Sequence, residues 1–488
     1  MSAPRSYDAI VIGGGVSGLI AAAYLAKSHK KVLLLEAEDR LGGLCAPANL
    51  GDGFSAARGA PTLYALDPVV IRDLKFARSG LRFLTRDLAM VGLRSDGKHI
   101  VLSRDVHDTA ASIAVHSPSD AQAWPRFHKE LFEIARAMRP RWWEARGALP
   151  MGDACRSLDT IARTSATAWL DSWFESETLK ATLCFDATAG SVSSLEPASA
   201  LSLVWRAAQE MSGLQGAVMI PQGGMTALTE VLVKTATEVG CELRTGVRAT
   251  RLILDQGRVA GVQTESGSAY FAPVVLSATP RYQTLSELAP REALSIGYGD
   301  ALERPISPLT EACIVMKLRS APAFGGIAVP LASRFILAEK PEAYIAAEMT
   351  SRGGAIPDEI PMEFVIPTWM DSSLAPPGQH ILSVIARPLP LLRFEERAGL
   401  KTLVAARVVA ALEKFMPGIS REISDIEVFS PGVAGYPIRV PSMLADAAHR
   451  IETPIEGLFL CGAGAEAVPA ISGRAARIAA SFAMKGGR

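Results

Sequence analysis

The sequence predicts an α/β protein, with a Rossmann-like domain built from three sequence segments and an α+β substrate domain built from the chain between them. Three observations lead to this prediction. A short apolar strand, a glycine turn and an Ala/Leu-rich helix follow one another near the N-terminus; the same order recurs near the C-terminus; helix and strand patterns alternate between residues 221 and 278. We expect the first domain at 1–90, 215–299 and 445–488, and the second at 91–214 (helical) and 300–444 (sheet).

Composition excludes several classes of protein. Fifty Lys and Arg residues balance fifty Asp and Glu residues, so no net charge attracts nucleic acid. Although 49% of the residues are hydrophobic, no apolar run approaches the roughly 18 residues that cross a bilayer. Met1–Ser6 lacks the features of a signal peptide. The six cysteines lie far apart with no CxxC pair, which predicts neither disulfides nor a metal site. We expect a cytoplasmic protein.

The first motif is a glycine turn between the strand at 7–12 and the helix at 19–26. Gly13 permits the tight turn, Gly15 lets a pyrophosphate approach the backbone, and Gly18 allows the helix to pack closely. Val16 and Ser17 complete the glycine turn directly before the helix, whose N-terminus can hold the phosphates. The turn therefore predicts a dinucleotide site.

The second motif follows the next apolar strand. This strand ends at Glu36, eighteen positions after the last motif glycine, where a carboxylate can accept the ribose hydroxyls. Ala37 follows, and then Arg40, Gly42 and Gly43, a pattern of E-x3-R-x-G-G that places an arginine and bare backbone beside the same pyrophosphate. The pattern resembles the extended motif of FAD proteins in the glutathione-reductase-like superfamily, in the branch that holds amine oxidases and phytoene desaturases. The resemblance implies FAD as the cofactor.

Two later blocks complete the resemblance. Pro221–Met225 leads into a helix and then strands, and the strand and glycine turn at 457–465 precede an Ala-rich helix at about 472–484. In the family, the N-terminus of that last helix points at the flavin ring, and its dipole favours the anionic reduced flavin. Val247 is one of the residues that the resemblance places beside the cofactor, but a buried strand valine without ligand contact would look the same. The resemblance implies these further cofactor contacts: Gly59, Ala60, Val247, Gly464, Ala465, Ala470 and Ile471.

The run Asp371–His380 resembles the D-x-S-L-A-P-P-G-K-H segment of phytoene-desaturase-like proteins, and more narrowly the group of pyridine nucleotide-disulphide oxidoreductase domain-containing protein 2. Despite that group's name, only Cys45 follows the first helix, so a flavin–dithiol relay lacks its second thiol. No second glycine turn of the dinucleotide type occurs, which argues against an NAD(P)H domain. The chain also departs from relatives: 465–473 replaces a glycine-rich run, and 431–437 contains no histidine.

The predicted substrate domain is rich in aromatic residues. Two explanations fit the tryptophans equally, an apolar aromatic tunnel or ordinary core packing. Arg136–Arg146 mixes basic and indole groups, as peripheral membrane segments do, although a solvated helix end looks the same. Lys317 either approaches the flavin, as lysines do in amine oxidases, or lies on an edge strand. Six of the seven tryptophans fall in the first half of this domain: Trp124, Trp142, Trp143, Trp169, Trp173 and Trp205.

These observations predict an FAD-dependent dehydrogenase or desaturase. It would remove a hydride and a proton from an apolar or alicyclic small molecule, the hydride going to flavin N5, with dioxygen or a quinone as electron acceptor. No side chain stands out as the catalytic base, and the oligomeric state is not predicted. Three alternatives stay open: a flavin amine oxidase, a flavin-dependent double-bond isomerase, and a non-catalytic flavin-bound scaffold.

Overall fold

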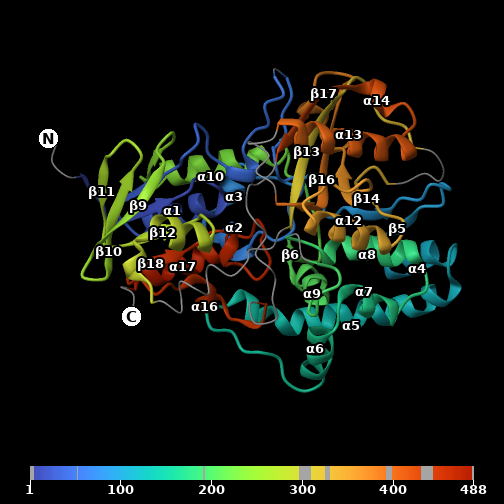
Figure 1. Cartoon of the computed structure of the whole chain (residues 1–488), viewed down its shortest axis with the longest axis horizontal. Helices are drawn as coiled ribbons and strands as arrows, with labels where there is room; N and C mark the ends of the chain where they lie inside the picture. The colour runs from blue at the N-terminus through green and yellow to red at the C-terminus, as the bar shows by residue number, and fades with distance from the viewer. Residues whose placement is uncertain are drawn as a thin grey trace.

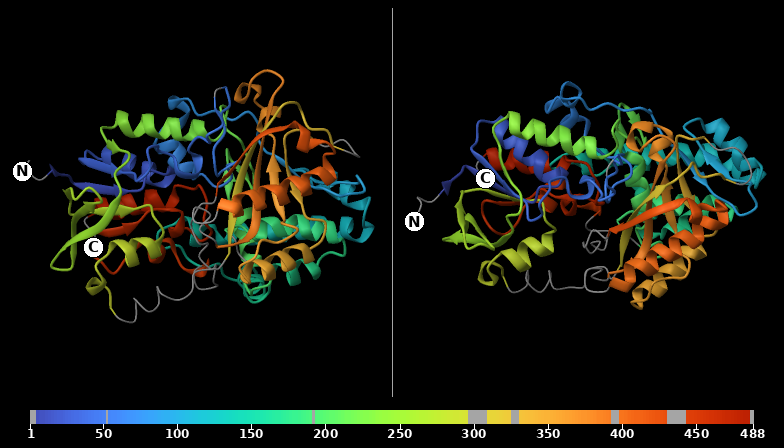
Figure 2. Two further views of the ribbon diagram at one scale, coloured as in Figure 1. Left: turned by 45° about the horizontal axis from the view of Figure 1, so that its top comes forward. Right: turned by 90° about the horizontal axis from the view of Figure 1, so that it is seen from above.

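The computed structural model describes residues 5–51, 53–190, 193–295, 309–324, 330–391, 398–429 and 443–485. Two units lie side by side in Figure 1, one built around a parallel sheet and the other around a larger mixed sheet. Both ends of the chain lie in the first unit, and the two further views in Figure 2 place them there as well. The α/β fold class predicted from the sequence is confirmed.

The parallel sheet draws its strands from three distant parts of the chain. Its order is β18-β12-β2-β3-β8, and every neighbouring pair is parallel. β2 and β3 are buried along their whole length, as expected for strands covered on both faces. The strands are β2 (Ala9–Ile12), β3 (Val32–Leu35), β8 (Glu242–Arg244), β12 (Val275–Ser277) and β18 (Leu458–Leu460).

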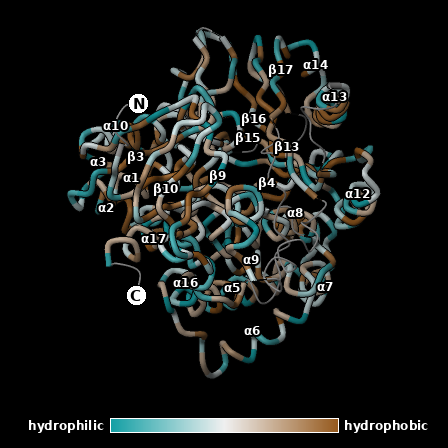
Figure 3. The backbone as a smooth tube through the Cα atoms, turned by 60° about the vertical axis from the view of Figure 1, so that its left-hand side comes forward, coloured by the Kyte–Doolittle hydropathy of each residue, from teal (hydrophilic) through white to brown (hydrophobic). Residues whose placement is uncertain are grey.

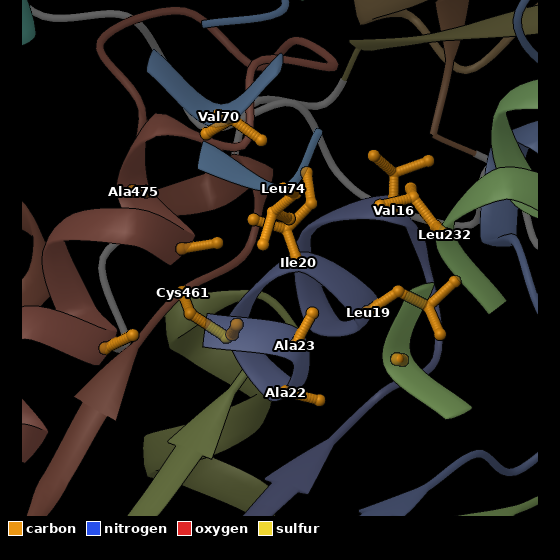
Figure 4. Packing of buried hydrophobic residues seen from close by; sticks show 14 of the residues in the cluster. Val16, Leu19, Ile20, Ala22, Ala23, Val70, Leu74, Leu232, Cys461 and Ala475 are labelled. Atoms are coloured by element: carbon orange, nitrogen blue, oxygen red, sulfur yellow. The ribbon is translucent and has the colours of Figure 1, made fainter. Parts of the chain in front are cut away.

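Helices cover one face of this sheet. α1 (Val16–Lys27) packs between α10 (Thr226–Glu238) and α17 (Arg474–Met484). Figure 4 shows α1 carrying Leu19 and Ile20 into this packing, with Leu232 from α10 and Ala475 from α17 close by. The small residues of α1 let the neighbouring helices approach it closely.

A smaller sheet covers the opposite face. Its order is β1-β11-β10-β9, in which β9, β10 and β11 form an antiparallel meander. Because side chains alternate along a strand, Ile10 and Leu33 face this smaller sheet, whereas Val11 and Leu34 face the helices. The strands are β1 (Arg5–Ser6), β9 (Ala249–Asp255), β10 (Arg258–Thr264) and β11 (Ala269–Phe271).

The second unit contains a seven-stranded sheet of order β17-β13-β16-β15-β14-β4-β5. Phe335 and Phe364 lie on one face, in a core shared with α13 (Ala398–Phe415). The other face points toward the first unit and toward the helices of the second. The strands are β4 (Ala89–Gly92), β5 (Ile100–Leu102), β13 (Leu309–Leu318), β14 (Ser333–Leu337), β15 (Met362–Val365), β16 (His380–Pro390) and β17 (Ile423–Phe429). β4 thus spans the boundary that the sequence placed at residue 90.

Helices form the rest of this unit. The longest, α5, begins with Pro118 in its first turn, and Ser117 accepts a hydrogen bond from the Asp120 amide at 3.1 Å, which caps it. α6 has one buried face, and Figure 3 shows hydrophilic and hydrophobic residues alternating along it. The helices are α4 (Val106–Ala114), α5 (Pro118–Trp143), α6 (Asp153–Arg163), α7 (Ala166–Asp171), α8 (Glu177–Ala187), α9 (Ala200–Ala208) and α12 (Glu342–Arg352).

The tryptophans predicted to line a tunnel or to dock on a membrane belong to this helical core. Trp142 is 1% exposed, and its indole Nε1 donates to the Met443 carbonyl at 2.8 Å. Arg139 and Arg474 each lie 4.7 Å from the ring centroid of Trp143. The Trp142 ring is thus buried and the half-buried Trp143 ring packs against Arg139 and Arg474, so neither ring supports the membrane segment that was one of the two explanations for 136–146. Within the described residues, no helix is long and apolar enough to cross a membrane.

Candidate functional site

A cavity of about 490 Å³ lies between the two units. Backbone and small side chains of the parallel-sheet unit form one wall, and side chains from α8, α9 and strands β13 to β16 form the other. The carboxyl ends of β2 and β3 meet at this cavity, as expected for a ligand site in a parallel sheet.

Most residues predicted to bind the cofactor line the first wall. These are Gly13, Gly15, Val16, Ser17, Glu36, Gly42, Gly43, Gly59, Ala60, Gly464, Ala470 and Ile471. Five predicted residues do not line it: Gly18, Ala37, Arg40, Val247 and Ala465. Gly18 lies behind the turn, where an added Cβ would be 1.8 Å from the Gly13 carbonyl oxygen, so close packing requires glycine there.

The glycine turn and the second motif pair with each other through their backbones. The Gly42 amide donates to the Gly14 carbonyl at 2.9 Å, and a Cβ added at Gly15 would meet only the Gly43 Cα, at 3.8 Å. α1 starts beside them with no acidic residue in its first turn and no side chain capping its amides. These uncapped amides and bare backbone suit a pyrophosphate, so the residues present fit a bound dinucleotide.

Glu36 holds the turn as well as facing the cavity. Its Oε2 accepts the Gly14 amide at 2.5 Å and its Oε1 accepts the Glu38 amide at 2.8 Å. The Val247 amide donates to the Glu36 carbonyl at 2.8 Å, while the Val247 side chain packs into the core between the two sheets. Val247 is half-buried in the loop before β9, so it is neither the cavity-lining residue nor the buried strand valine considered above.

The arginine beside the glycine pair is not the one that the sequence indicated. Arg40 points away from the cavity, donating to Asp39 at 3.1 Å with 42% of its side chain exposed. Arg58 lines the cavity instead: its Nε donates to the Gly43 carbonyl at 3.1 Å and its Nη2 to Glu38 at 2.7 Å. Its position directly before Gly59 was the only sequence feature that could have identified it.

The C-terminal glycine turn also reaches the cavity, but the helix behind it is capped by its own chain. The Ala475 amide donates to Glu466 Oε1 at 2.9 Å, and the Arg474 amide donates to Ser472 Oγ at 3.0 Å. Glu466 and Ser472 lie in the run that departs from relatives. The expectation that the N-terminus of this helix acts on the flavin unopposed therefore needs correction, because a buried carboxylate already occupies it.

Lys317 does not reach the cavity. Its Nζ donates to the Leu50 carbonyl at 2.9 Å and pairs with Asp425 at 3.0 Å. This places it in the contact between the two units, as a structural lysine. The run 431–437 lies outside the described residues.

The second wall is charged, which the sequence did not predict. Arg334 bridges two carboxylates, with Nη2 2.5 Å from Asp186 and Nη1 2.7 Å from Glu363. Arg387 donates to Glu311 at 3.1 Å, where a register irregularity in β13 brings these two side chains together. None of the six tryptophans lines this cavity, so core packing, the second of the two explanations, accounts for them. The charged residues are Asp186, Arg206, Glu311, Arg334, Glu363 and Arg387.

Burial and pairing act in opposite directions on the carboxylates of this wall. For Asp186, burial works to raise the pKa, but Arg334, Arg206 and Arg387 outweigh it, so the pKa lies below its ordinary value. Burial raises the pKa of Glu363 above its ordinary value, and Arg334 offsets only part of the effect. Asp186 is therefore the more firmly ionised of the two.

Comparison with known proteins agrees with this geometry. The family model for flavin containing amine oxidoreductases matches residues 16–303. The chain is 28% identical to rat pyridine nucleotide-disulfide oxidoreductase domain-containing protein 2, over 98% of this chain and 93% of the relative. It is 24% identical to the lycopene-forming phytoene desaturase of Pseudescherichia vulneris, over 97% and 98% respectively. Among solved structures, a redesigned putrescine oxidase superposes with a TM-score of 0.66 at 16% identity, over 99% and 98%.

The family match covers more than half of the chain, and the relatives match it nearly end to end. The cavity wall of bare backbone and uncapped helix amides agrees with the flavin cofactor that the family name states. The chain belongs to the flavin containing amine oxidoreductase family and is an FAD-dependent oxidoreductase.

Proposed function

We propose that the protein is a dehydrogenase or desaturase that removes a hydride and a proton from an apolar or alicyclic small molecule. The observation that carries this proposal is the continuity of the cavity. The wall that fits the dinucleotide and the wall built by the substrate domain enclose one space. A molecule held against the second wall would therefore lie beside the cofactor.

The part of the cavity between the two walls is apolar. Leu63, Phe185, Ala189 and Ile385 contribute to its lining, together with the ring face of Tyr64. Such a surface orients a hydrocarbon segment and excludes water from the reacting carbon. When bound, FAD supplies a two-electron acceptor that takes up the hydride at N5. The released proton goes to a carboxylate of the second wall or to water, and dioxygen or a quinone reoxidises the enzyme.

The source of electrons tests this proposal. We expect NADH and NADPH to leave the oxidised flavin band unchanged in anaerobic stopped-flow mixing, because one dinucleotide fold serves the FAD and the sequence has no second one. Alicyclic donors should bleach the band, and dithionite serves as the control for a reducible flavin. Rapid bleaching by NADPH alone would mean a reductase or monooxygenase.

Replacing Glu36 tests the adenosine end of the site. We expect Glu36→Ala to weaken FAD binding by about 1–3 kcal/mol, the range for lost charge-assisted hydrogen bonds. The carboxylate also holds the Gly14 amide at 2.5 Å, so the turn itself should loosen. Titration of apoprotein with FAD, followed by fluorescence quenching, measures the effect. Glu36→Gln keeps one acceptor oxygen, so its Kd for FAD should lie between those of the wild type and of Glu36→Ala. An unchanged Kd for Glu36→Ala would mean that this residue does not bind the cofactor.

A further inference from the structure

Burying the charged side chains of the second wall costs free energy, and their ion pairs contribute little to the stability of the fold. Three arginines and three carboxylates face the cavity from α8, α9 and strands β13 to β16. Phe335 and Phe364 point into the apolar core on the opposite face, so strand alternation directs their neighbours Arg334 and Glu363 to the cavity. Buried ion pairs usually contribute less stability than apolar side chains of the same volume. This wall therefore calls for a functional explanation.

The carboxylates of the wall are all closely paired. Arg334 lies within 2.7 Å of both Asp186 and Glu363, and Arg387 lies 3.1 Å from Glu311. A cationic substrate group would have to displace an arginine from one of them. No carboxylate of this wall is therefore free to bind a cationic group.

Arg206 is different, because its charge is only partly compensated. Its closest carboxylate among the described residues is Asp186, 3.8 Å from Nε, and Arg334 holds that carboxylate much closer. Its Nη1 donates to the Gly216 carbonyl at 3.2 Å, and its Nε has no hydrogen-bond partner in the described part of the chain. Arg206 is 4% exposed, and burial lowers its pKa. A buried guanidinium whose nearest carboxylate is held more closely by another arginine would be stabilised by an anion that a ligand supplies.

The position of Arg206 connects it to both walls. Its guanidinium lies 4.4 Å from the ring centroid of Tyr64, which belongs to the same cavity-lining stretch as the predicted flavin contacts Gly59 and Ala60. A group bound at Arg206 would hold the apolar remainder of its molecule along Tyr64 and Phe185, between the two walls.

We propose that the substrate is an apolar molecule bearing a carboxylate, and that Arg206 binds this carboxylate and so determines specificity. A planar guanidinium matches a carboxylate with two parallel hydrogen bonds, which a neutral or cationic group cannot make. The inference rests on the proposed function in one respect, that this cavity is the substrate site. It changes the expected substrate from a plain hydrocarbon to an acid.

Three probes of one shape test the charge preference on the FAD-loaded protein: cyclohexanecarboxylate, cyclohexanecarboxamide and cyclohexylamine. Flavin difference spectra and calorimetry measure the three Kd values without turnover. We expect the carboxylate to bind at least about tenfold more tightly than the amide or the amine, the effect of one charge-assisted pair. Equal binding of all three probes, or tightest binding of the amine, would overturn the inference.

Variants then assign the preference to Arg206. R206Q should lose at least about tenfold in affinity for the carboxylate and nothing for the amide, since only the charged pair is removed. R206K keeps the positive charge but not the two parallel N–H donors of the guanidinium, and it should lose less affinity for the carboxylate than R206Q. R163Q is the control, because Arg163 is an exposed arginine of α6 paired with Asp159. Unchanged carboxylate affinity in R206Q would contradict the assignment; if R206Q fails to retain FAD or to fold, R206K and the probe series decide.

The two proposals fail in different ways. If the carboxylate binds through Arg206 but no donor of any class bleaches the flavin, the proposed dehydrogenase activity is wrong and the carboxylate site stands. If a neutral alicyclic donor bleaches the flavin while carboxylates do not bind, the activity stands and the carboxylate site is wrong.

Discussion

Replacing Gly15 with valine is expected to abolish FAD binding while leaving the protein folded. The backbone of Gly15 lies at φ −68° and ψ 176°, a conformation open to any residue, so valine introduces no strain there. A Cβ at this position would meet only the Gly43 Cα, at 3.8 Å, within the protein. The added side chain would instead fill the space beside the α1 amides that the pyrophosphate needs.

The absorbance spectrum of the purified variant, with its melting temperature, measures both outcomes. Gly18→Ala is the matched contrast: its Cβ would be 1.8 Å from the Gly13 carbonyl oxygen, so this variant should lose both FAD and stability. A Gly15→Val protein that retains stoichiometric FAD would show that the pyrophosphate does not lie against this turn.

Replacing Arg334 with alanine is expected to destabilise the protein by about 3–5 kcal/mol at neutral pH, the range for breaking a buried ion pair by removing one partner. Arg334 is 5% exposed and compensates Asp186 and Glu363 together. Without it, both carboxylates would stay in the interior with less neutralising charge. Denaturant unfolding measures the loss, and a change below about 1 kcal/mol, as for an exposed pair, would mean that water reaches this wall freely.

Both carboxylates should favour the folded state at lower pH in this variant. In the wild type they act in opposite directions: the lowered pKa of Asp186 gives stability that is lost as pH falls through its folded value, whereas the raised pKa of Glu363 gives stability that increases as pH falls. In the Arg334→Ala protein, burial without compensation should raise the pKa of both carboxylates, so the folded state binds protons more readily than the unfolded state. Stability should then increase as pH falls from 7 toward 5, and more steeply than in the wild type, where only Glu363 acts in that direction.

The sequence predicted those parts of the site that depend on local pattern. The motif from Gly13 to Gly18 joins β2 to the first turn of α1, two elements whose periodicity is clear, so its geometry follows from neighbouring residues alone. The choice between Arg40 and Arg58 did not follow from spacing. Both are near the glycine pair, and only the path of the chain through residues 47–57 decides which guanidinium returns to it.

The charged wall could not be predicted, because its members are far apart in the sequence. Asp186 and Arg206 lie on helices, whereas Arg334 and Glu363 each lie in a short strand where a single charge usually marks a solvent-facing position. Tryptophan clustering indicated the helical core correctly but said nothing of the cavity, since aromatic residues suit either place. The polar strand Glu242–Arg244 was missed for a similar reason, as it lies at the edge of the parallel sheet.

The order of strands in the parallel sheet also sets the time at which the protein can load its cofactor during synthesis. The parallel sheet starts with β2 and β3. It is complete only when β18, which the ribosome produces about 420 residues after β3, has been added beside β12. At roughly 5–20 residues per second, the nascent chain carries an open sheet for about 20–80 seconds. Throughout this interval, the side of α1 that α17 will cover stays exposed to water. Cofactor loading is therefore expected only after β18 and α17 have been synthesised, and the unfinished chain is expected to depend on chaperones that shield apolar surface.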